Sequence, residues 1–276
     1  MDAAVKRGVK ARSVVTLGGR LRNILGPATG AEVGQMTHPR ARGLYDALVE
    51  TGVATDTHRN ALSSAKAWGR WCVGEGYLGA NPFADVEGTG RRKHGKPQLT
   101  VSESRKLLAT CIAEATRPQA GAIATMAYLL LGCRAEELLK RKVRDLDDDG
   151  RLLWIREAKT RSGERRLEVP EVLRPFLLAM AEGKRPEDDL FGQSRQWAHG
   201  WVGEMCKRAG VRIVPPHGLR GTHATLATMA GATGPIVSEA LGHATGAVTE
   251  KHYTTGEATE NARQRASWSV LEGGRR

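Results

Sequence analysis

Cysteine, aromatic residues and long apolar segments are all scarce in this sequence. Its 276 residues include four cysteines, three phenylalanines and four tyrosines. No two cysteines form a CxxC pair and no cysteine–histidine cluster has zinc spacing, so we expect reduced thiols and no bound metal. No apolar run approaches the roughly 20 residues that a membrane helix needs, and the N-terminus lacks the apolar core of a signal peptide. We therefore expect a cytoplasmic protein that binds no membrane.

Basic residues outnumber acidic ones. The chain carries 42 Lys and Arg against 30 Asp and Glu, a formal net charge of +12, and its isoelectric point is about 9.9. An excess of this size favours a polyanionic partner, most often nucleic acid. A soluble protein with scattered surface lysines and arginines would have the same composition. Composition alone does not decide between these two interpretations.

The apolar pattern predicts a helical N-terminal domain over residues 1–88. Three helices are expected, one from a capping Ser13 to Leu25, one over His38–Glu50, and one capped by Thr55. Asn81-Pro82 ends this block, because the residue before a proline is pushed out of helical geometry.

Residues 89–99 are predicted to form a basic linker. Glycine and proline interrupt any periodic apolar pattern there. Its basic residues, our candidates for DNA binding, are Arg91, Arg92, Lys93 and Lys96. A basic linker between two domains suits a hinge that follows DNA phosphates. A solvated, flexible tether is the commoner meaning of such a charged run.

Residues 100–276 are predicted to form a mainly helical catalytic domain with a small antiparallel β-sheet. The expected elements are a capping box at Thr100 to Glu103 with its helix, a helix from Gln119 to Leu131, strands over Leu152–Arg156 and Arg166–Val169 around a hairpin turn, and helices from Val172 onward. The whole chain is therefore expected to be α+β, with helices dominant.

Six residues of this domain bear the groups that attack on a phosphodiester needs, namely Arg134, Lys159, His217, Arg220, His243 and Tyr253. Taken singly, each has an ordinary structural explanation, such as a surface arginine, a solvated turn lysine or a packing tyrosine. Together they supply a nucleophile, a base, a proton donor, and two guanidinium groups whose forked shape matches phosphate oxygens. No acidic cluster suggests a magnesium site.

The order and spacing of these residues resemble those of the tyrosine recombinases, also called the phage-integrase family. Residues 129–147 (LLLGCRAEELLKRKVRDLD) resemble the family's first arginine box, and residues 217–253 its second box, which ends in the nucleophile. Residues 154–170 resemble the hairpin that bears the family's lysine. Residues 55–83 resemble the end of its helical core-binding domain.

One position departs from the family pattern. A histidine usually follows the second arginine directly, whereas this sequence has Gly221 after Arg220. His223 offers a replacement two residues further on, although a buried packing role is the expectation that we favour for it. The departure concerns local support of Arg220 and not the chemistry.

The resemblance implies a covalent mechanism. Tyr253 would attack the scissile phosphate, forming a 3′-phosphotyrosyl bond and releasing a 5′-hydroxyl. Arg134 and Arg220 would hold the non-bridging oxygens, His217 would assist as a base, and Lys159 would protonate the departing 5′-oxygen.

Two further positions complete the implied site. His243 would form a hydrogen bond to the phosphate, and Glu137 would orient the arginine region. Because a phosphotyrosine preserves the bond energy, the resemblance implies neither ATP nor a metal. It implies a site-specific recombinase or integrase, associated with the nucleoid, that acts as a homotetramer on two double-stranded DNA sites. A topoisomerase IB-like relaxer and a catalytically inactive DNA-binding protein remain as alternatives.

The C-terminal segment is predicted to form a helix over residues 257–271. A stripe of small apolar residues recurs along it, consisting of Ala258, Ala262, Ala266 and Val270, with Leu271 beside the last. Such a stripe suits docking into a groove, either of the same domain or of a neighbouring copy. The resemblance favours the neighbouring copy.

Overall fold

A computed structural model describes residues 8, 11–91, 96–116, 119–156, 164–230, 232, 268 and 271. The chain divides into two compact units, Met1–His94 and Gly95–Arg276, called here the N-terminal and C-terminal units. The division falls within residues 89–99, where the sequence predicts a linker. Within the part of the chain that the structure describes, no helix combines the length and the apolar character needed to cross a membrane.

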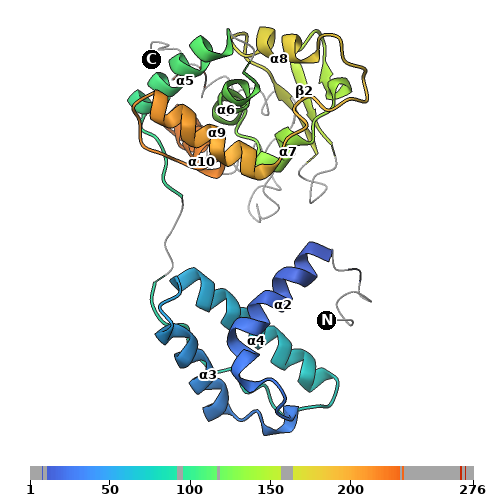
Figure 1. Ribbon diagram of the computed structural model, residues 1–276, viewed down its shortest axis with the longest axis vertical. Coiled ribbons are helices and arrows are strands. Elements are labelled where there is room, and N and C mark those ends of the chain that lie inside the picture. The colour runs from blue at the N-terminus through green and yellow to red at the C-terminus, as the bar shows by residue number, and fades with distance from the viewer. Residues whose placement is uncertain are drawn as a thin grey trace. The chain divides into compact units, whose positions relative to one another are not determined.

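The N-terminal unit is helical, as Figure 1 shows. Its elements are α2 (Ala11–Leu25), two 3₁₀ turns at Gly26–Ala28 and Val33–Gln35, α3 (His38–Glu50) and α4 (Thr55–Gly74). The predicted bounds of the second helix are confirmed, and Thr37 caps it. The predicted caps of the other two are wrong. Ser13 lies inside α2 and Thr55 is already the first residue of α4, whereas a capping residue must itself stand outside the helix with non-helical dihedral angles.

Tyr45 lies at the centre of the N-terminal unit. Its ring is fully buried, and its hydroxyl lies 2.8 Å from His58 Nδ1. The same hydroxyl accepts a hydrogen bond from the backbone of Thr89, and Arg59 donates to the carbonyl oxygen of Gly90. The chain after α4 therefore stays bonded to the helices of this unit up to the point where the basic residues begin.

The C-terminal unit is built around α6 (Ala120–Leu131), which is apolar on all sides. The other helices formed by its described residues are α5 (Val101–Ala115), α7 (Ala135–Leu139), α8 (Arg174–Ala181), α9 (Arg195–Arg208) and α10 (Pro216–Met229), with a 3₁₀ turn at Val143–Asp145. All five contact α6. A helix that is hydrophobic all round must be enclosed, and every residue of α6 from Gly121 to Leu131 is buried.

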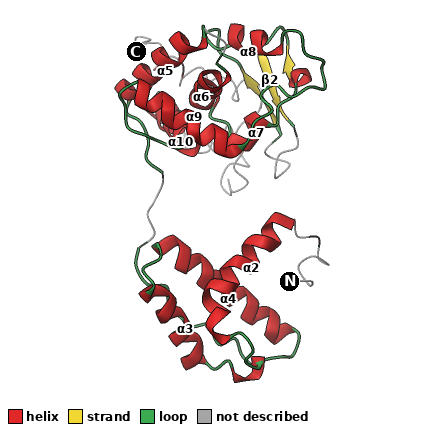
Figure 2. Cartoon of the chain, viewed as in Figure 1, coloured by secondary structure: helices red, strands yellow, loops and turns green. Residues whose placement is uncertain are grey.

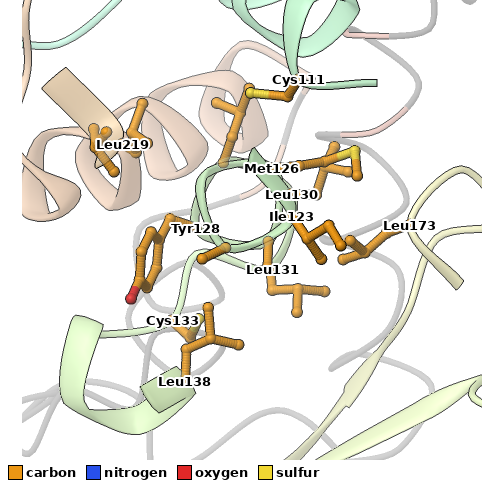
Figure 3. Packing of buried hydrophobic residues seen from close by; sticks show 14 of the residues in the cluster. Cys111, Ile123, Met126, Tyr128, Leu130, Leu131, Cys133, Leu138, Leu173 and Leu219 are labelled. Carbon is orange, nitrogen blue, oxygen red and sulfur yellow. The ribbon is translucent and has the colours of Figure 1, made fainter. Parts of the chain in front are cut away.

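Side chains from four directions close over α6. Figure 3 shows Cys111 of α5, Leu138 of α7, Leu173 before α8 and Leu219 of α10 packed around the helix. The predicted capping box of α5 is confirmed, since Thr100 and Glu103 bond each other's backbone amides. The predicted helix over 119–131 is confirmed as well. This core fixes the ends of α6 and the start of α10, where the candidate catalytic residues begin.

A small antiparallel sheet lies beside the helices, drawn yellow in Figure 2. Its strands are β1 (Leu146–Asp147), β2 (Leu152–Ile155) and β3 (Arg165–Glu168), in the order β1-β2-β3. The hairpin of β2 and β3 is confirmed, but β2 ends one residue earlier than predicted and the whole of β3 lies one residue earlier. The sequence did not predict β1, because two residues are too few to show an alternating pattern. Leu153 pairs with Leu167 and Ile155 with Arg165, and all four of these side chains are buried.

The four cysteines, Cys72, Cys111, Cys133 and Cys206, are free and buried. Burial raises the pKa of each thiol, and it raises that of Cys133 to about 12.

Two residues of the predicted C-terminal helix are described, and both pack on their own chain. Trp268 donates its indole N–H to the carbonyl oxygen of Leu130 at 2.9 Å, and Leu271 joins the same hydrophobic core. The small-residue stripe before Trp268 lies outside the described residues. Docking of that stripe on a neighbouring copy stays a prediction, whereas Trp268 and Leu271 belong to the core of this chain.

Candidate active site

Arg134 stands at the junction between α6 and α7. The helix α6 ends at Gly132, which has φ +60° and so adopts the left-handed conformation that suits glycine. Arg134 is the N-cap of α7, and its backbone N–H donates to Glu137 Oε2 at 2.8 Å. Its guanidinium also donates to Glu137 Oε1 at 2.5 Å. The capping carboxylate therefore fixes both the backbone and the side chain of Arg134.

Glu137 binds a second arginine that sequence reasoning missed. Arg165, the first residue of β3, donates to Glu137 Oε2 at 3.0 Å, and both side chains are buried. Burial by itself raises the pKa of Glu137, but the charge of Arg165 and the hydrogen bonds from Arg165 and Arg134 outweigh it and lower the pKa to about 2. A signal was present in the sequence, because Arg165 shares the inward-facing register of Leu167 and Val169.

Arg220 reaches the same junction from α10. Its side chain is among the most buried in the protein, and Nη1 donates to the carbonyl oxygen of Gly132 at 2.8 Å. Burial and the positive charge of Arg134 lower the pKa of Arg220 to about 10, while the charge of Glu137 opposes this shift. The guanidinium stays protonated near neutral pH. The structure thus brings the two arginines that are predicted to hold one phosphate together at the junction between α6 and α7.

His217 lies in the first turn of α10, three residues before Arg220, and it is exposed. Partial burial lowers its pKa, and the positive charges of Arg220, Arg134 and Lys96 lower it further. A histidine with a pKa below its usual value of about 6.5 is mostly neutral at pH 7. His217 is therefore in the form that can accept a proton.

The described end of the linker lies along α10. Leu99 N donates to Thr222 Oγ1 at 3.0 Å, and Thr225 Oγ1 donates to Gln98 Oε1 at 2.6 Å. A Cβ on Gly218 would stand 2.4 Å from the carbonyl oxygen of Pro97, so only glycine fits there. A Cβ on Gly221 would stand 2.8 Å from the amide nitrogen of Gln98. Gly221, the departure from the family pattern, thus lets Gln98 lie close over the helix.

His223 packs in the interior. Its Nδ1 donates to the carbonyl oxygen of Leu129 at 3.1 Å, and its ring fills the space where a Cβ on Gly132 would stand. Burial lowers the pKa of His223 to about 4, with the charges of Arg220 and Arg165 acting in the same direction and the hydrogen bond to Leu129 opposing them. His223 thus supports the C-terminal end of α6, to which Arg220 is also bonded.

The buried His223 should make the protein lose stability in mild acid. Because the pKa is lower in the folded chain, the unfolded chain takes up a proton first as the pH falls below about 6.5. The free energy of unfolding should then fall by about 2 kcal/mol between pH 7.5 and pH 5 on account of this residue. Urea unfolding at both pH values measures the change. His223→Gln keeps a donor for Leu129, and its loss over the same interval should be smaller. An equal loss in both proteins would contradict the assignment.

The remaining predicted residues divide into two groups. Arg91 and Lys96 are described and exposed. Those outside the described residues are Arg92, Lys93, Lys159, His243 and Tyr253. The structure thus brings Arg134, Glu137, His217 and Arg220 together with Arg165, and the positions of the nucleophile and the lysine rest on the sequence.

Residues 97–260, more than half of the chain, match the Phage integrase family. The chain belongs to this family. The match covers the helical core, with its two arginines at one junction, and the hairpin beside them.

Named relatives agree with the family match. The tyrosine recombinase XerC of Mycobacterium sp. (strain KMS) is 28% identical over 248 residues, which are 80% of this chain and 79% of that protein. The tyrosine recombinase XerA of Saccharolobus solfataricus is 32% identical over 117 residues, 41% of this chain and 38% of that protein.

Solved structures share the fold. The Tn1549 transposon integrase in complex with a circular intermediate DNA superimposes with a TM-score of 0.72 at 18% identity, covering 96% of both chains. A lambda integrase dimer bound to a COC′ core site gives 0.68 at 17% identity, covering 92% of this chain and 96% of that one.

Proposed function

We propose that this protein is a site-specific DNA recombinase that cleaves and rejoins DNA strands through a 3′-phosphotyrosyl bond to Tyr253. One observation carries the proposal. Arg134 and Arg220 come from separate elements, yet the carboxylate of Glu137 and the carbonyl oxygen of Gly132 hold them at one junction, close enough to His217 that their charges lower its pKa.

Two arginines held together repel each other, so their grouping suggests an anionic ligand. The charge of Arg134 lowers the pKa of Arg220, which is the sign of that repulsion. Arg134, Arg165 and Arg220 surround a single described carboxylate, Glu137, and this part of the site is therefore positive. A phosphodiester has two non-bridging oxygens that guanidinium groups bind with matched geometry. Binding becomes stronger as charge develops on those oxygens in the transition state.

The proposed reaction is a transesterification in which atoms and charge balance. The phenolic oxygen of Tyr253 forms a bond to phosphorus while the bond to the 5′-oxygen breaks. The proton of Tyr253 passes toward His217, and Lys159 gives a proton to the 5′-oxygen. His243 donates a hydrogen bond to the phosphate. Reversal of the same steps with a new 5′-hydroxyl rejoins the strands, so no ATP is consumed.

The proposal extends to the architecture on DNA. Residues 1–88 would be a core-binding domain and residues 100–276 the catalytic domain, with both on double-stranded DNA and the linker 89–99 along the phosphates. Arg91, Arg92, Lys93 and Lys96 would contribute phosphate contacts there. Support comes from the solved relatives, which include an integrase complexed with DNA and an integrase dimer on a core site. A homotetramer that joins two sites in the cytoplasmic nucleoid completes the proposal.

The test is covalent capture. DNA that stays attached to the protein after rapid denaturation of expressing cells is sequenced, and its site is built into a duplex with a nick beside the scissile phosphate. With chelator present and no ATP, the protein should form an adduct that resists detergent. Absence of the adduct on the recovered site would overturn the proposal. Exchange between two such sites supports a recombinase, whereas relaxation of supercoiled DNA without exchange would support the topoisomerase-like alternative.

A further inference from the structure

A buried arginine that the proposed reaction does not use lies two residues after the end of α7. Arg141 is 3% exposed, and its side chain makes several hydrogen bonds. Nε donates to the carbonyl oxygen of Glu137 at 2.6 Å, and Nη1 donates to Asp145 Oδ2 at 3.2 Å. Arg141 is thus bonded both to the backbone of α7 and to the carboxylate of the following 3₁₀ turn.

The same guanidinium also holds the end of β2. Nη1 of Arg141 donates to the carbonyl oxygen of Trp154 at 2.9 Å, and Nη2 donates to that of Arg156 at 3.0 Å. Asp145 adds a contact, because one of its carboxylate oxygens accepts from Arg156 Nε at 2.9 Å. Arg156 is the last described residue before the segment that contains Lys159. The point at which the chain leaves β2 is therefore fixed to α7.

The second strand of the hairpin is fixed to the same helix. Arg165 pairs with Ile155 across the sheet, and its guanidinium binds Glu137. Glu137 lies in α7, whose N-cap is Arg134. The residues that flank the segment 157–163 on both sides are thus connected, through buried arginines, to the five-residue helix whose N-cap is Arg134.

The free-energy cost of burying a guanidinium indicates that Arg141 has a role beyond filling space. Removing a guanidinium from water is expensive, and an apolar side chain of similar volume often stabilises such a position equally well. A buried arginine with several directed hydrogen bonds specifies geometry that an apolar side chain does not. Here the specified geometry is the distance and direction between α7 and the exit of β2.

We infer that Arg141, with Asp145, is a positioning residue for the leaving-group acid. It sets where the segment carrying Lys159 leaves the sheet relative to Arg134. The inference rests on the proposed function and deepens it by assigning a support to one step, protonation of the 5′-oxygen.

The test separates that step from the others by changing the leaving atom. Cleavage rates are measured on two nicked substrates that differ only in the 5′-bridging atom, oxygen or sulfur, since a thiolate leaves without protonation. Arg141→Lys keeps the charge but not the fork that reaches both carbonyl groups. On the oxygen substrate it should be slower than the native protein by about tenfold to a hundredfold, the size expected for a displaced acid. On the sulfur substrate the rate should return to within about twofold of native.

Three further variants are compared with Arg141→Lys. Asp145→Asn removes the charged partner of Arg141 and should show the same recovery, in case Arg141→Lys folds poorly. Lys159→Ala gives the reference recovery. Arg144→Lys is a matched surface change, because Arg144 is half exposed and pairs with the exposed Glu187, and it should leave both rates unchanged. All rates are measured well below the unfolding temperature of the least stable variant.

Two results would overturn the inference, namely equal slowing of Arg141→Lys and Asp145→Asn on both substrates, or no slowing on oxygen. These leave the proposed function intact if the native protein still forms its adduct. If Lys159→Ala is itself slowed equally on both substrates, Lys159 is not the acid and Arg141 has no positioning role for it. The assignment of Tyr253 as the nucleophile is not affected by that result. Failure of the native protein to form any adduct is a failure of the proposed function.

Discussion

Tyr253→Phe should abolish the covalent protein–DNA adduct and leave DNA binding unchanged. The substitution removes one oxygen atom, the proposed nucleophile, and keeps the aromatic ring. Binding rests mainly on lysine and arginine contacts to phosphates, which the substitution does not alter. We therefore expect complete loss of the detergent-resistant band on the nicked substrate, with the same affinity and the same salt dependence as the native protein.

A matched tyrosine variant serves as the control for this measurement. Tyr77 is an exposed tyrosine of the N-terminal unit, and Tyr77→Phe should form adduct at the native rate. Peptide mapping of the native adduct should recover the phosphotyrosyl bond on the peptide that contains Tyr253. Adduct formation by Tyr253→Phe at an undiminished level would show that another residue is the nucleophile.

Glu137→Gln should cost about 3 kcal/mol of stability, as expected when one partner of a buried ion pair is removed. The isosteric amide keeps the shape of the side chain but loses the charge that Arg134 and Arg165 share. The same charges lower the pKa of Glu137 to about 2. A carboxylate whose pKa is depressed in the folded state stabilises the protein above its unfolded pKa, and this contribution is lost as the pH falls from about 4.5 toward 2.

Glu137→Gln should also slow catalysis, because Arg134 loses the carboxylate that orients its guanidinium. We expect adduct formation to slow by about a hundredfold, with similar loss on the oxygen and sulfur substrates, since phosphate binding and not leaving-group protonation is affected. Glu136→Gln is the control. Glu136 is the neighbouring exposed carboxylate, paired with the exposed Arg195 at 3.5 Å, and its loss should cost less than about 1 kcal/mol. Urea unfolding of the two variants compares them directly, and equal stability would refute the buried network.

Much of the fold could be predicted from sequence because the signals are local. The helix His38–Glu50, the capping box at Thr100 and the apolar helix that ends before Gly132 each depend on residues within a few positions of one another. The predictions of helix caps at Ser13 and Thr55 were wrong for a related reason. Serine and threonine are also compatible with the first turn of a helix, and only the backbone angles of their neighbours decide which position they occupy.

The candidate site was predicted in part, and the missing part is non-local. Arg134, Glu137, His217 and Arg220 stand in recognisable order along the chain, so their resemblance to a family identified them. Arg165 and Arg141 lie in a strand and after a short helix, where a charged residue normally faces solvent. Their burial follows from the packing of the hairpin against α7. The alternation with Leu167 and Val169 indicates that Arg165 faces inward, but no local pattern shows which side chain it meets there.

The inaccessibility of all four thiols makes this protein a convenient subject for site-directed labelling. Maleimide and similar reagents attack thiolates, and burial holds the native cysteines in the protonated form out of reach of solvent. A cysteine introduced at an exposed position, such as Glu50 in α3 or Ser102 in α5, would react far faster than the native ones. Fluorophores attached at these two positions would report the separation of the two units in solution as DNA is added, without first removing any residue of the core.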